Sequence, residues 1–246
     1  MSSFPIVNRI GRQLTRWWWA PVEVLVFHAV SDVYDKSRNE RVDWSQTDDF
    51  KSHIRLLKTR YTFVSLEEAL RRLCQWNCRK ERLAVLTSDD GYASVLGVLP
   101  FLEEERIPVT LFVNPKYLDG VSRREGYAEE PQYMTRAQLW ELTSPLISVG
   151  MHGYEHDDAT QQSIAEFEVS VEKCIEMLQS HPNYIPFFAY TWGRYNNATQ
   201  CLLQKKGIVP VLVGGTSNYH FNNAIDRRPI DSTYWKKSWK KMNDNY

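Results

Sequence analysis

The sequence predicts a single α/β domain built on a parallel sheet that closes, or nearly closes, into a barrel. Short apolar runs and amphipathic stretches alternate about seven times along the chain, which is typical of repeated β–α units. Composition shows no break that would divide the 246 residues into two domains. Hydrophobic residues make up 43% of the chain, which is enough for a sizeable core.

Strands and helices of the first half follow from their residue patterns. Each expected strand is a short apolar run bounded by turn residues. The first expected helix carries Phe50, Ile54 and Leu57 on one face, and Ser65 with Glu68 forms a capping box that opens the second. We expect strands at 22–27, 61–64, 83–86 and 109–113, and helices at 47–60, 65–76 and 94–105, the last of them bent or started at Pro100.

The second half continues the alternation after a long polar connection over residues 114–134. A connection of that length is usually functional. Capping boxes that begin at Thr135 and Ser163 each open a helix. We expect strands at 146–150, 187–190 and 208–213, a helix at 163–179, another that ends at Gly207, and a last short segment at 224–230.

The two ends of the chain lie outside the expected domain of residues 22–231. Residues 1–21 form a basic, Trp-rich extension in which arginines lead into Trp17–Trp19. Two interpretations stay open: a weak peripheral membrane contact through these tryptophans, or a helix packed across the bottom of the domain, which we favour. Residues 232–246 form a basic tail that we expect to be a solvated helix end.

Charge and hydropathy exclude several classes of partner. Thirty Lys and Arg balance thirty Asp and Glu, so no net charge draws the chain to nucleic acid or to an anionic membrane. No apolar stretch reaches the ~20 residues of a transmembrane segment, and the N-terminus does not resemble a secretory signal. We therefore expect a cytoplasmic protein, and we interpret its four cysteines as buried free thiols of a reducing compartment.

Two adjacent carboxylates, Asp89 and Asp90, follow the apolar run 83–86, and Gly91 permits a sharp turn after them. Adjacent carboxylates repel each other, so each must be solvated, paired or bound to a cation. Taken alone, the pair is explained equally well by an Asx-turn that caps the next helix and by a reactive site.

A histidine pair farther along the chain favours the reactive site. His152 and His156 follow the strand 146–150, and their spacing lets two imidazoles share a metal ion. One Asp with two His supplies three ligands and leaves a position open for water, as in catalytic zinc sites. Barrels gather their chemistry at the carboxyl ends of the strands, where His28 and the stretch Tyr190–Trp192 are also expected.

With these residues in place, the chain resembles the polysaccharide deacetylases of the NodB homology domain, carbohydrate esterase family 4, over roughly residues 22 to 231. Three motifs carry the resemblance. Thr87–Gly91 resembles T-F-D-D-G, His152–His156 resembles H-x-x-x-H, and Phe188–Arg194 resembles F-A-Y-P-Y-G-R. The flanking stretches 63–69 and 107–113 are also similar to the family.

The resemblance implies a fold, an activity and a cofactor. The fold would be a distorted (β/α) barrel of about seven strands. Asp90, His152 and His156 would bind a divalent metal, usually zinc, and Asp89 would be the general base. The reaction would be hydrolysis of the N-acetyl group of an amino sugar, with a backbone N–H of the third motif stabilising the oxyanion.

Other candidate residues complete the predicted site. Tyr190, Trp192 and His28 are expected to contact the saccharide. Arg227 resembles a late family arginine, and two interpretations are equally open: it holds Asp89 as part of the catalytic set, or it lies on the surface. For His28, a role as a satisfied core histidine is a stronger expectation than a role as proton donor.

The third motif and the C-terminal region depart from the family pattern. Thr191 replaces the usual proline, Trp192 the second tyrosine, and Ser88 the phenylalanine of the first motif. The late L-x-H that supplies the family's catalytic acid has no counterpart. The acid that protonates the leaving group is therefore unassigned at this stage.

Three hypotheses about function follow. The first is a metal-dependent sugar N-deacetylase that acts in the biosynthesis of a bacterial surface polysaccharide such as lipopolysaccharide or O-antigen. The second, motivated by the departures, is a non-catalytic carbohydrate-binding relative. The third is hydrolysis of small cyclic amides, as in metal-free relatives, and the retention of both His152 and His156 argues against it.

Overall fold

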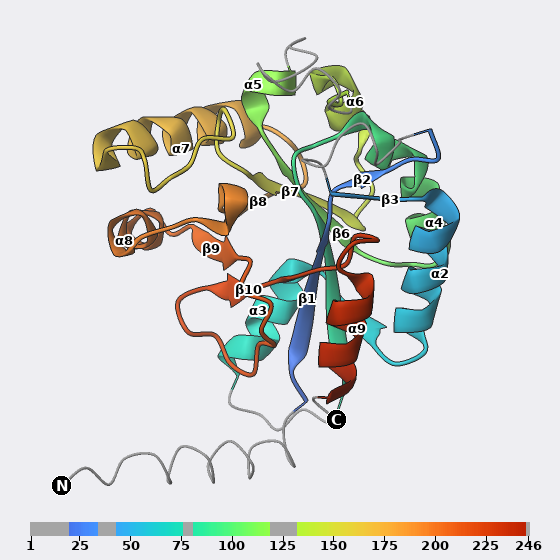
Figure 1. The fold of residues 1–246 in the computed structure, drawn as a ribbon. Helices are drawn as coiled ribbons and strands as arrows, with labels where there is room; N and C mark the ends of the chain where they lie inside the picture. Colours follow the sequence, from blue (N-terminus) through green and yellow to red (C-terminus); the bar gives the residue numbers. More distant parts are fainter. Residues whose placement is uncertain (1–19, 34–42, 76–80, 119–131, 245–246) are drawn as a thin grey trace, which may run out of the picture.

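The computed structural model describes residues 20–33, 43–75, 81–118 and 132–244, and its main sheet confirms the predicted (β/α) barrel (Figure 1). The prediction about Trp17–Trp19 lies outside these residues. All strand pairs of the main sheet are parallel. Its nine strands are β1 (Val22–Phe27), β4 (Thr62–Phe63), β5 (Leu83–Ser88), β6 (Val109–Val113), β7 (Ile147–Met151), β8 (Tyr184–Ala189), β9 (Val209–Leu212), β10 (Ile225–Asp226) and β11 (Arg228–Pro229).

The last strand segment brings the two ends of the sheet together. The strand order is β10-β9-β8-β7-β6-β5-β1-β11, with β4 paired to β5 off this path. β10 and β11 are consecutive pieces of residues 225–229, separated by Arg227, and they pair with β9 and with β1 respectively. One short segment therefore bridges the first and last strands. Among the described residues the ring has about seven positions, as expected for this fold class.

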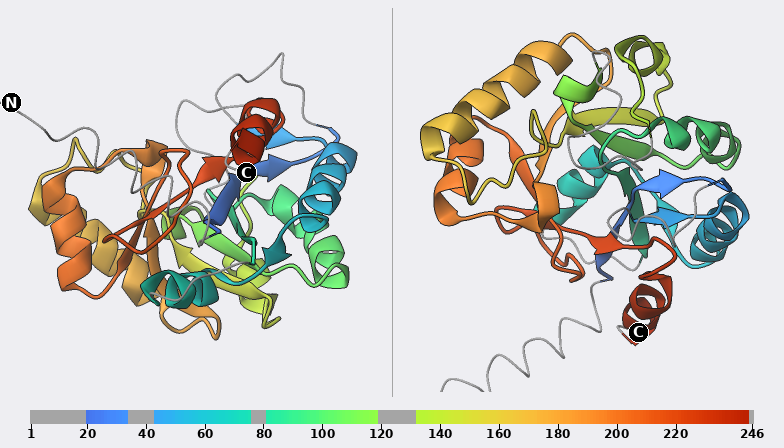
Figure 2. Two further views of the ribbon diagram at one scale, coloured as in Figure 1. Left: turned by 90° about the horizontal axis from the view of Figure 1, so that it is seen from below. Right: turned by 45° about the horizontal axis from the view of Figure 1, so that its top comes forward.

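Helices lie around the outside of the strands (Figure 2). Local signals in the sequence explain where several of them begin, since Thr135 and Ser163 form complete capping boxes and the Ser65 side chain accepts from the Glu68 N–H. The helices are α2 (Thr47–Lys58), α3 (Leu66–Cys74), α4 (Leu99–Glu104), α5 (Pro115–Leu118), α6 (Arg136–Glu141), α7 (Ile164–Leu178), α8 (Asn197–Lys205) and α9 (Trp235–Asp244). β2 (Ala29–Val30) and β3 (Trp44–Ser45) form a separate small sheet.

The structure refines two of the expected helices. As expected, the helix at 94–105 is interrupted at Pro100: a short 3-10 helix, η1 (Ala93–Gly97), is followed by α4, because Pro100 lacks an N–H and fits only in the first turn of a helix. The tail forms the expected helix, α9, with exposed lysines, but its other face is packed. Trp235 stacks on His53 with ring centroids 3.8 Å apart.

Apolar residues form two main layers. The larger layer lies between the sheet and the surrounding helices. The second contains alternate residues of the strands, such as Val24 on β1, Val85 on β5 and Phe187 on β8, together with Leu66 and Leu73 of α3. Alternate strand residues point to the same side of a sheet, so we assign this layer to the barrel interior, with α3 covering its lower end (Figure 1). The upper end, where the strands finish, is left for a site.

Two further expectations from the sequence, on the burial of the cysteines and on membrane-spanning segments, can be compared with the structure. Cys174 is a buried free thiol as predicted, but Cys74 and Cys201 are free and exposed, since they lie on the outer sides of α3 and α8. The prediction of buried thiols is wrong for these two. Within the described residues, no helix combines the length and hydrophobicity that a membrane span requires.

Candidate active site

A cavity of about 360 Å³ opens at the carboxyl ends of the strands. Parallel strands finish at the same rim, so the residues that directly follow β1, β5, β7 and β8 are brought together there. The cavity is lined by seven of the eight sequence-predicted site residues: His28, Asp89, Asp90, His152, His156, Tyr190 and Trp192. Arg227 lies behind this wall. Asp43 and Tyr234 complete the polar part of the lining and were not predicted.

Asp90, His152 and His156 converge on one point. Asp90 Oδ1 lies 3.0 Å from His156 Nε2 and 3.5 Å from His152 Nε2, and all three residues are buried. Ligands about 2.0–2.2 Å from a tetrahedral zinc lie roughly 3.3 Å from one another, so this spacing suits a shared cation. The structure thus brings together the three residues that the sequence proposes as metal ligands.

Hydrogen bonding around these three residues also fits a cation. His152 Nδ1 lies 2.8 Å from the Ala189 carbonyl oxygen, which fixes the proton on Nδ1 and leaves the Nε2 lone pair directed at the site. Asp90 Oδ1 is buried without a hydrogen-bond donor of acceptable geometry. A buried carboxylate oxygen without a donor is costly, and a cation between it and the imidazoles removes that cost.

Backbone strain concentrates at the same place. Asp90, His156 and Trp192 have φ values of 71°, 60° and 58°, in the left-handed region that non-glycine residues rarely adopt. Gly91 continues the strained turn after Asp90 with φ 77°. Strain of this kind persists only where surrounding contacts impose it, and it is frequent at functional sites.

Hydrogen bonds hold the loop that carries both histidines. The Asn114 side-chain amide donates to the carbonyls of His152 and Gly153, and the Tyr117 hydroxyl donates to the Glu155 carbonyl over 2.9 Å. The Thr191 hydroxyl donates to the Asp157 carbonyl, which ties this loop to the third motif. The imidazoles are therefore positioned before any ligand binds.

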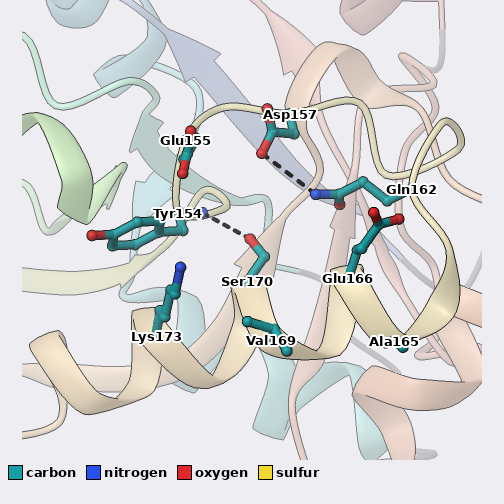
Figure 3. A pocket seen from close by; sticks show the side chains of 9 residues that line it. All are labelled: Tyr154, Glu155, Asp157, Gln162, Ala165, Glu166, Val169, Ser170 and Lys173. Carbon is teal, nitrogen blue, oxygen red and sulfur yellow. Dashed lines mark hydrogen bonds between the residues drawn. The ribbon is translucent and has the colours of Figure 1, made fainter.

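Helix α7 supports the outer side of the same loop (Figure 3). The Tyr154 N–H donates to Ser170 Oγ over 3.1 Å, and Gln162 Nε2 donates to Asp157 Oδ2 over 3.4 Å. Lys173 extends from α7 to the face of the Tyr154 ring, 4.8 Å from its centroid. A small cavity of about 350 Å³ remains between loop and helix.

Arg227 orients the Asp89 carboxylate and favours its ionised form. Its guanidinium makes a bidentate contact with the Asp89 carboxylate, at 2.6 Å and 2.8 Å, and donates to Thr87 Oγ1 at 3.0 Å. Arg227 is completely buried, so the alternative of a surface residue is removed. It packs over the Phe112 ring, for which Gly150 leaves space because a Cβ there would lie 2.6 Å from the ring. Arg227 is a positioning residue.

Both carboxylates are held in the charged form. Burial raises the pKa of Asp89, but the Arg227 guanidinium, together with His152 and His28, outweighs burial and keeps that pKa below its usual value. Burial likewise raises the pKa of Asp90, and the neighbouring His156 and His152 hold it well below the usual range. At neutral pH both carboxylates are therefore ionised.

His28 and Asp231 form a histidine–carboxylate pair at the cavity wall, and the sequence did not predict this pairing. The sequence offered His28 but gave no sign of its partner, Asp231. Asp231 is fully buried, its Oδ1 accepts from the His28 N–H at 3.0 Å, and its Oδ2 contacts His28 Nδ1 at 3.0 Å. Burial lowers the pKa of His28, but Asp231, together with Asp90 and Asp89, outweighs burial and raises it to about 10. His28 therefore carries a proton at neutral pH, beside the reactive cavity.

Asp43 adds a second carboxylate near this pair, and the three ligand atoms lie within 4.8 Å of one another. The pair nevertheless differs from the Asp90 group, because both Asp231 oxygens already accept hydrogen bonds from His28. No buried acceptor of Asp231 is left for a cation to satisfy. This arrangement is built to hold a proton.

The two aromatic candidates lie in different environments. Trp192 is 51% exposed, and its ring meets the edge of His156 with centroids 4.8 Å apart. Tyr190 is fully buried, and its ring packs against Phe167 and Phe188. Trp192 can present an open face to a sugar, whereas Tyr190 contributes mainly to the floor of the cavity.

Comparison with known proteins identifies the class. The family model of polysaccharide deacetylases matches residues 77–211, which is more than half of the chain and contains Asp89, Asp90, His152, His156 and the third motif. The chain belongs to the polysaccharide deacetylase family, a family of hydrolases that act on carbon–nitrogen bonds other than peptide bonds. His28, Arg227 and Asp231 lie outside the matched residues.

Solved structures share the fold at low sequence identity. IcaB from Ammonifex degensii superposes with a TM-score of 0.76 and 20% identity, covering 92% of this chain and 98% of that one. The deacetylase PplD of Streptococcus pyogenes gives 0.71 and 20%, covering 91% and 98%. A de-N-acetylase from Aggregatibacter actinomycetemcomitans gives 0.69 and 17%, covering 90% and 99%. A search of curated proteins returned no match.

Proposed function

We propose that this chain is a metal-dependent N-deacetylase that hydrolyses the acetamide of an N-acetylated amino sugar. The observation that carries the proposal is the convergence of Asp90 Oδ1, which lacks a donor, with two imidazole nitrogens at the cavity that also contains ionised Asp89. Membership of the polysaccharide deacetylase family supports an enzyme over the non-catalytic alternative.

Asp90, His152 and His156 would hold the cation, for which we propose zinc. Two imidazoles and one carboxylate are a ligand set that zinc accepts in hydrolytic sites. A divalent cation bound there supplies Lewis acidity, which makes water more acidic and polarises a carbonyl. The protein's contribution is to fix three ligands and to leave the cavity side open to substrate.

Asp89 acts as the general base. Its carboxylate is buried, ionised and aligned by Arg227, and it accepts a proton from the water that attacks the acetyl carbonyl carbon. The new carbon–oxygen bond forms as this proton moves to Asp89. A backbone N–H of the Thr191–Gly193 turn is our candidate for stabilising the oxyanion that develops on the carbonyl oxygen.

His28 acts as the general acid that sequence reasoning left unassigned. Its Nδ1 is held by Asp231, so the proton on Nε2 is available on the cavity side. As the carbon–nitrogen bond breaks, His28 gives this proton to the leaving nitrogen, which yields acetate and a free amine. Trp192 provides an exposed aromatic face for the sugar ring at the rim.

We further propose that the enzyme takes part in the biosynthesis of a bacterial surface polysaccharide. The polysaccharide deacetylase family to which the chain belongs supports a role in polysaccharide metabolism. The cytoplasmic location expected from the sequence stays a prediction, which fractionation of cells producing the native protein tests. Its exclusive recovery outside the cell would contradict it.

Acetate release tests the proposed function. The purified protein, loaded with zinc, is mixed with N-acetylated saccharides, and free acetate is measured with wild type and with Asp89→Asn. We expect release by wild type and a loss of about 10²–10⁴-fold in the variant, which keeps the side-chain shape but removes the base. Saccharide binding by zinc-loaded wild type with no acetate from any saccharide would favour the non-catalytic alternative.

A further inference from the structure

One side of α9 carries an exposed stripe of lysines. The stripe consists of Lys236, Lys237, Lys240 and Lys241. A helix turns about 100° per residue, so these four positions cover roughly 140° of its circumference. The opposite side is buried, with Trp235, Ser238 and Met242 facing the protein. The helix is therefore amphipathic, and every exposed position that the structure describes on it is a lysine.

Contacts on the buried side fix α9 to the outside of the barrel, between β11 and α2 (Figure 1). The Ser238 hydroxyl donates to the Pro229 carbonyl oxygen of β11 over 2.5 Å. The Trp235 ring stacks on His53 of α2, and Met242 is buried in the larger apolar layer. Because the apolar side of α9 is already packed against the protein, the helix can offer a partner positive charge but little apolar surface.

The charge of the stripe is not balanced by neighbouring carboxylates. Within the described part of the chain, none of its four lysines forms an ion pair, whereas Lys116 and Lys206 do. Arg60, at the end of α2, adds a fifth cation beside α9. Its guanidinium lies 4.9 Å from the centroid of the Trp239 ring and donates to the neutral Asn243 side chain. We call Arg60 and the four lysines the basic face.

The basic face is a local excess of positive charge on a chain that is neutral as a whole. Salt at physiological concentration screens exposed charges that lie more than about 8 Å apart. Acidic residues elsewhere on the barrel therefore do not cancel the basic face for a surface that lies against α9. Near an anionic bilayer, each Lys or Arg strengthens binding about fivefold. Overall neutrality excludes a general attraction to polyanions, but it does not exclude this local one.

Two observations favour a bilayer over a nucleic acid as the partner. Nucleic-acid sites commonly stack bases on exposed aromatic rings, but Trp235 and Trp239 of α9 stack on each other with centroids 5.4 Å apart. In addition, residues 1–21 precede β1, which pairs with the strand β11 on which α9 packs. This extension contains three arginines, Trp17–Trp19 and no acidic residue, and tryptophan is enriched at membrane–water interfaces.

We propose that the basic face docks on the surface of a lipid bilayer that contains anionic headgroups. The contact is electrostatic, because the apolar side of α9 is packed against the barrel. This inference does not depend on the proposed deacetylase activity. α9 begins directly after Tyr234, which lines the reactive cavity, so docking through the basic face also sets the orientation of that cavity relative to the bilayer.

Co-sedimentation of the full chain with lipid vesicles tests the proposal. One set of vesicles contains phosphatidylcholine alone, and the other contains equal parts of phosphatidylcholine and phosphatidylglycerol, which is anionic. We expect the protein to bind the anionic vesicles and to bind phosphatidylcholine alone far more weakly. Binding to the anionic vesicles should weaken as salt is raised, because salt screens the basic face.

A pair of variants with the same change in net charge locates the contact. Lys240→Gln combined with Lys241→Gln removes two charges of the basic face, and we expect vesicle affinity to fall about thirtyfold. Lys205→Gln combined with Lys206→Gln removes two charges from α8, on another side of the barrel, and should bind as wild type does (Figure 1). Similar unfolding midpoints in urea will show that both variants are folded.

Several results would overturn the proposal. An equal loss of affinity in the α8 and α9 variants would mean that net charge, and not the basic face, governs binding. Full binding by the α9 variant, with loss only when Trp17, Trp18 and Trp19 are all replaced by alanine, would assign the contact to the extension. No binding to anionic vesicles at low salt, or tighter binding to a DNA duplex than to the vesicles, would reject the bilayer as the partner.

Discussion

Two groups of histidine and carboxylate side chains face the same cavity: Asp90 with His152 and His156, and Asp231 with His28. The first is suited to bind a metal cation, and the second to bind a proton. In the first, Asp90 Oδ1 lies near two imidazole nitrogens without accepting a hydrogen bond of acceptable geometry. In the second, Asp231 uses both carboxylate oxygens to hold the backbone and ring of His28. The residue types are the same, so composition alone does not separate them. The difference lies in which acceptors are already satisfied.

That difference indicates what each group holds. A buried carboxylate oxygen without a donor, beside two imidazole nitrogens, is stabilised by a cation, whereas a carboxylate bonded to an imidazole N–H stabilises a proton. The first group therefore suits Lewis-acid chemistry, and the second suits proton donation. The following predictions are ordered from the largest expected effect to the smallest, and each tests one side of this comparison.

Removing the charge of the first group should have the largest effect. Asp90→Asn keeps the side-chain size but weakens the cation site, so we expect bound metal to be lost and acetate release to fall about 10³-fold or more. Elemental analysis and acetate assays measure the two effects. Asp48→Asn, an exposed change on α2, is the control. Normal metal content in Asp90→Asn would contradict the assignment of this group as the cation site.

Removing the acid of the second group should leave the metal in place. His28→Gln deletes the proton donor, so we expect acetate release to fall about 10²–10³-fold while metal content stays at the wild-type level. Asp90→Asn is expected to lose its bound metal, whereas His28→Gln is expected to keep it, and this difference separates the two groups. Loss of metal in His28→Gln would mean that the two groups form one site, against the comparison above.

Changing the partner of His28 should shift the pH dependence. Burial lowers the pKa of His28, but Asp231, with smaller contributions from Asp90 and Asp89, raises it to about 10, so the imidazole keeps its proton well above neutral pH. In Asp231→Asn this support is gone, and His28 should lose its proton at lower pH. We expect about a tenfold loss at neutral pH and a basic limb of the kcat profile that moves to lower pH. If the basic limb of the kcat profile stays at the same pH in Asp231→Asn, His28 is not the general acid.

The smallest effect concerns stability. Because the folded-state pKa of His28 lies above the unfolded value of 6.5, its pairing with Asp231 stabilises the fold fully below pH 6.5, and this contribution is lost as pH rises through about 10. The unfolding free energy of His28→Gln should therefore fall below that of wild type by about 1–3 kcal/mol at pH 6. Urea titrations should show this gap closing toward pH 10, and a constant gap would contradict it.

Residue patterns were enough to predict the barrel and the metal-ligand candidates. Apolar runs that stop at Asp89 and at His152 place these groups at strand ends, and parallel strands necessarily finish at one rim. Helix starts at Ser65, Thr135 and Ser163 were correct because capping is a local interaction over three or four residues. Strand ends and helix caps depend on interactions between residues that are close together in the sequence, so they can be predicted from it.

Long-range pairings were not predictable in the same way. His28 and Asp231 are 203 positions apart, and no local pattern marks Asp231 as a partner. Arg227 and Asp89 are 138 positions apart, and the sequence left the arginine equally open to a surface position. Both pairs exist because residues 225–229 close the ring between β9 and β1.

The sequence by itself determined the fold class, the strand ends and the residue types able to bind a cation, since periodicity and spacing act over a few residues. Tertiary structure alone decided which carboxylate pairs with His28 and which arginine pairs with Asp89. Both pairings depend on the closure of the ring by residues 225–229 between β9 and β1. Which hydrogen-bond acceptors remain unsatisfied is set by neighbours distant in sequence, and only the packed fold assembles those neighbours.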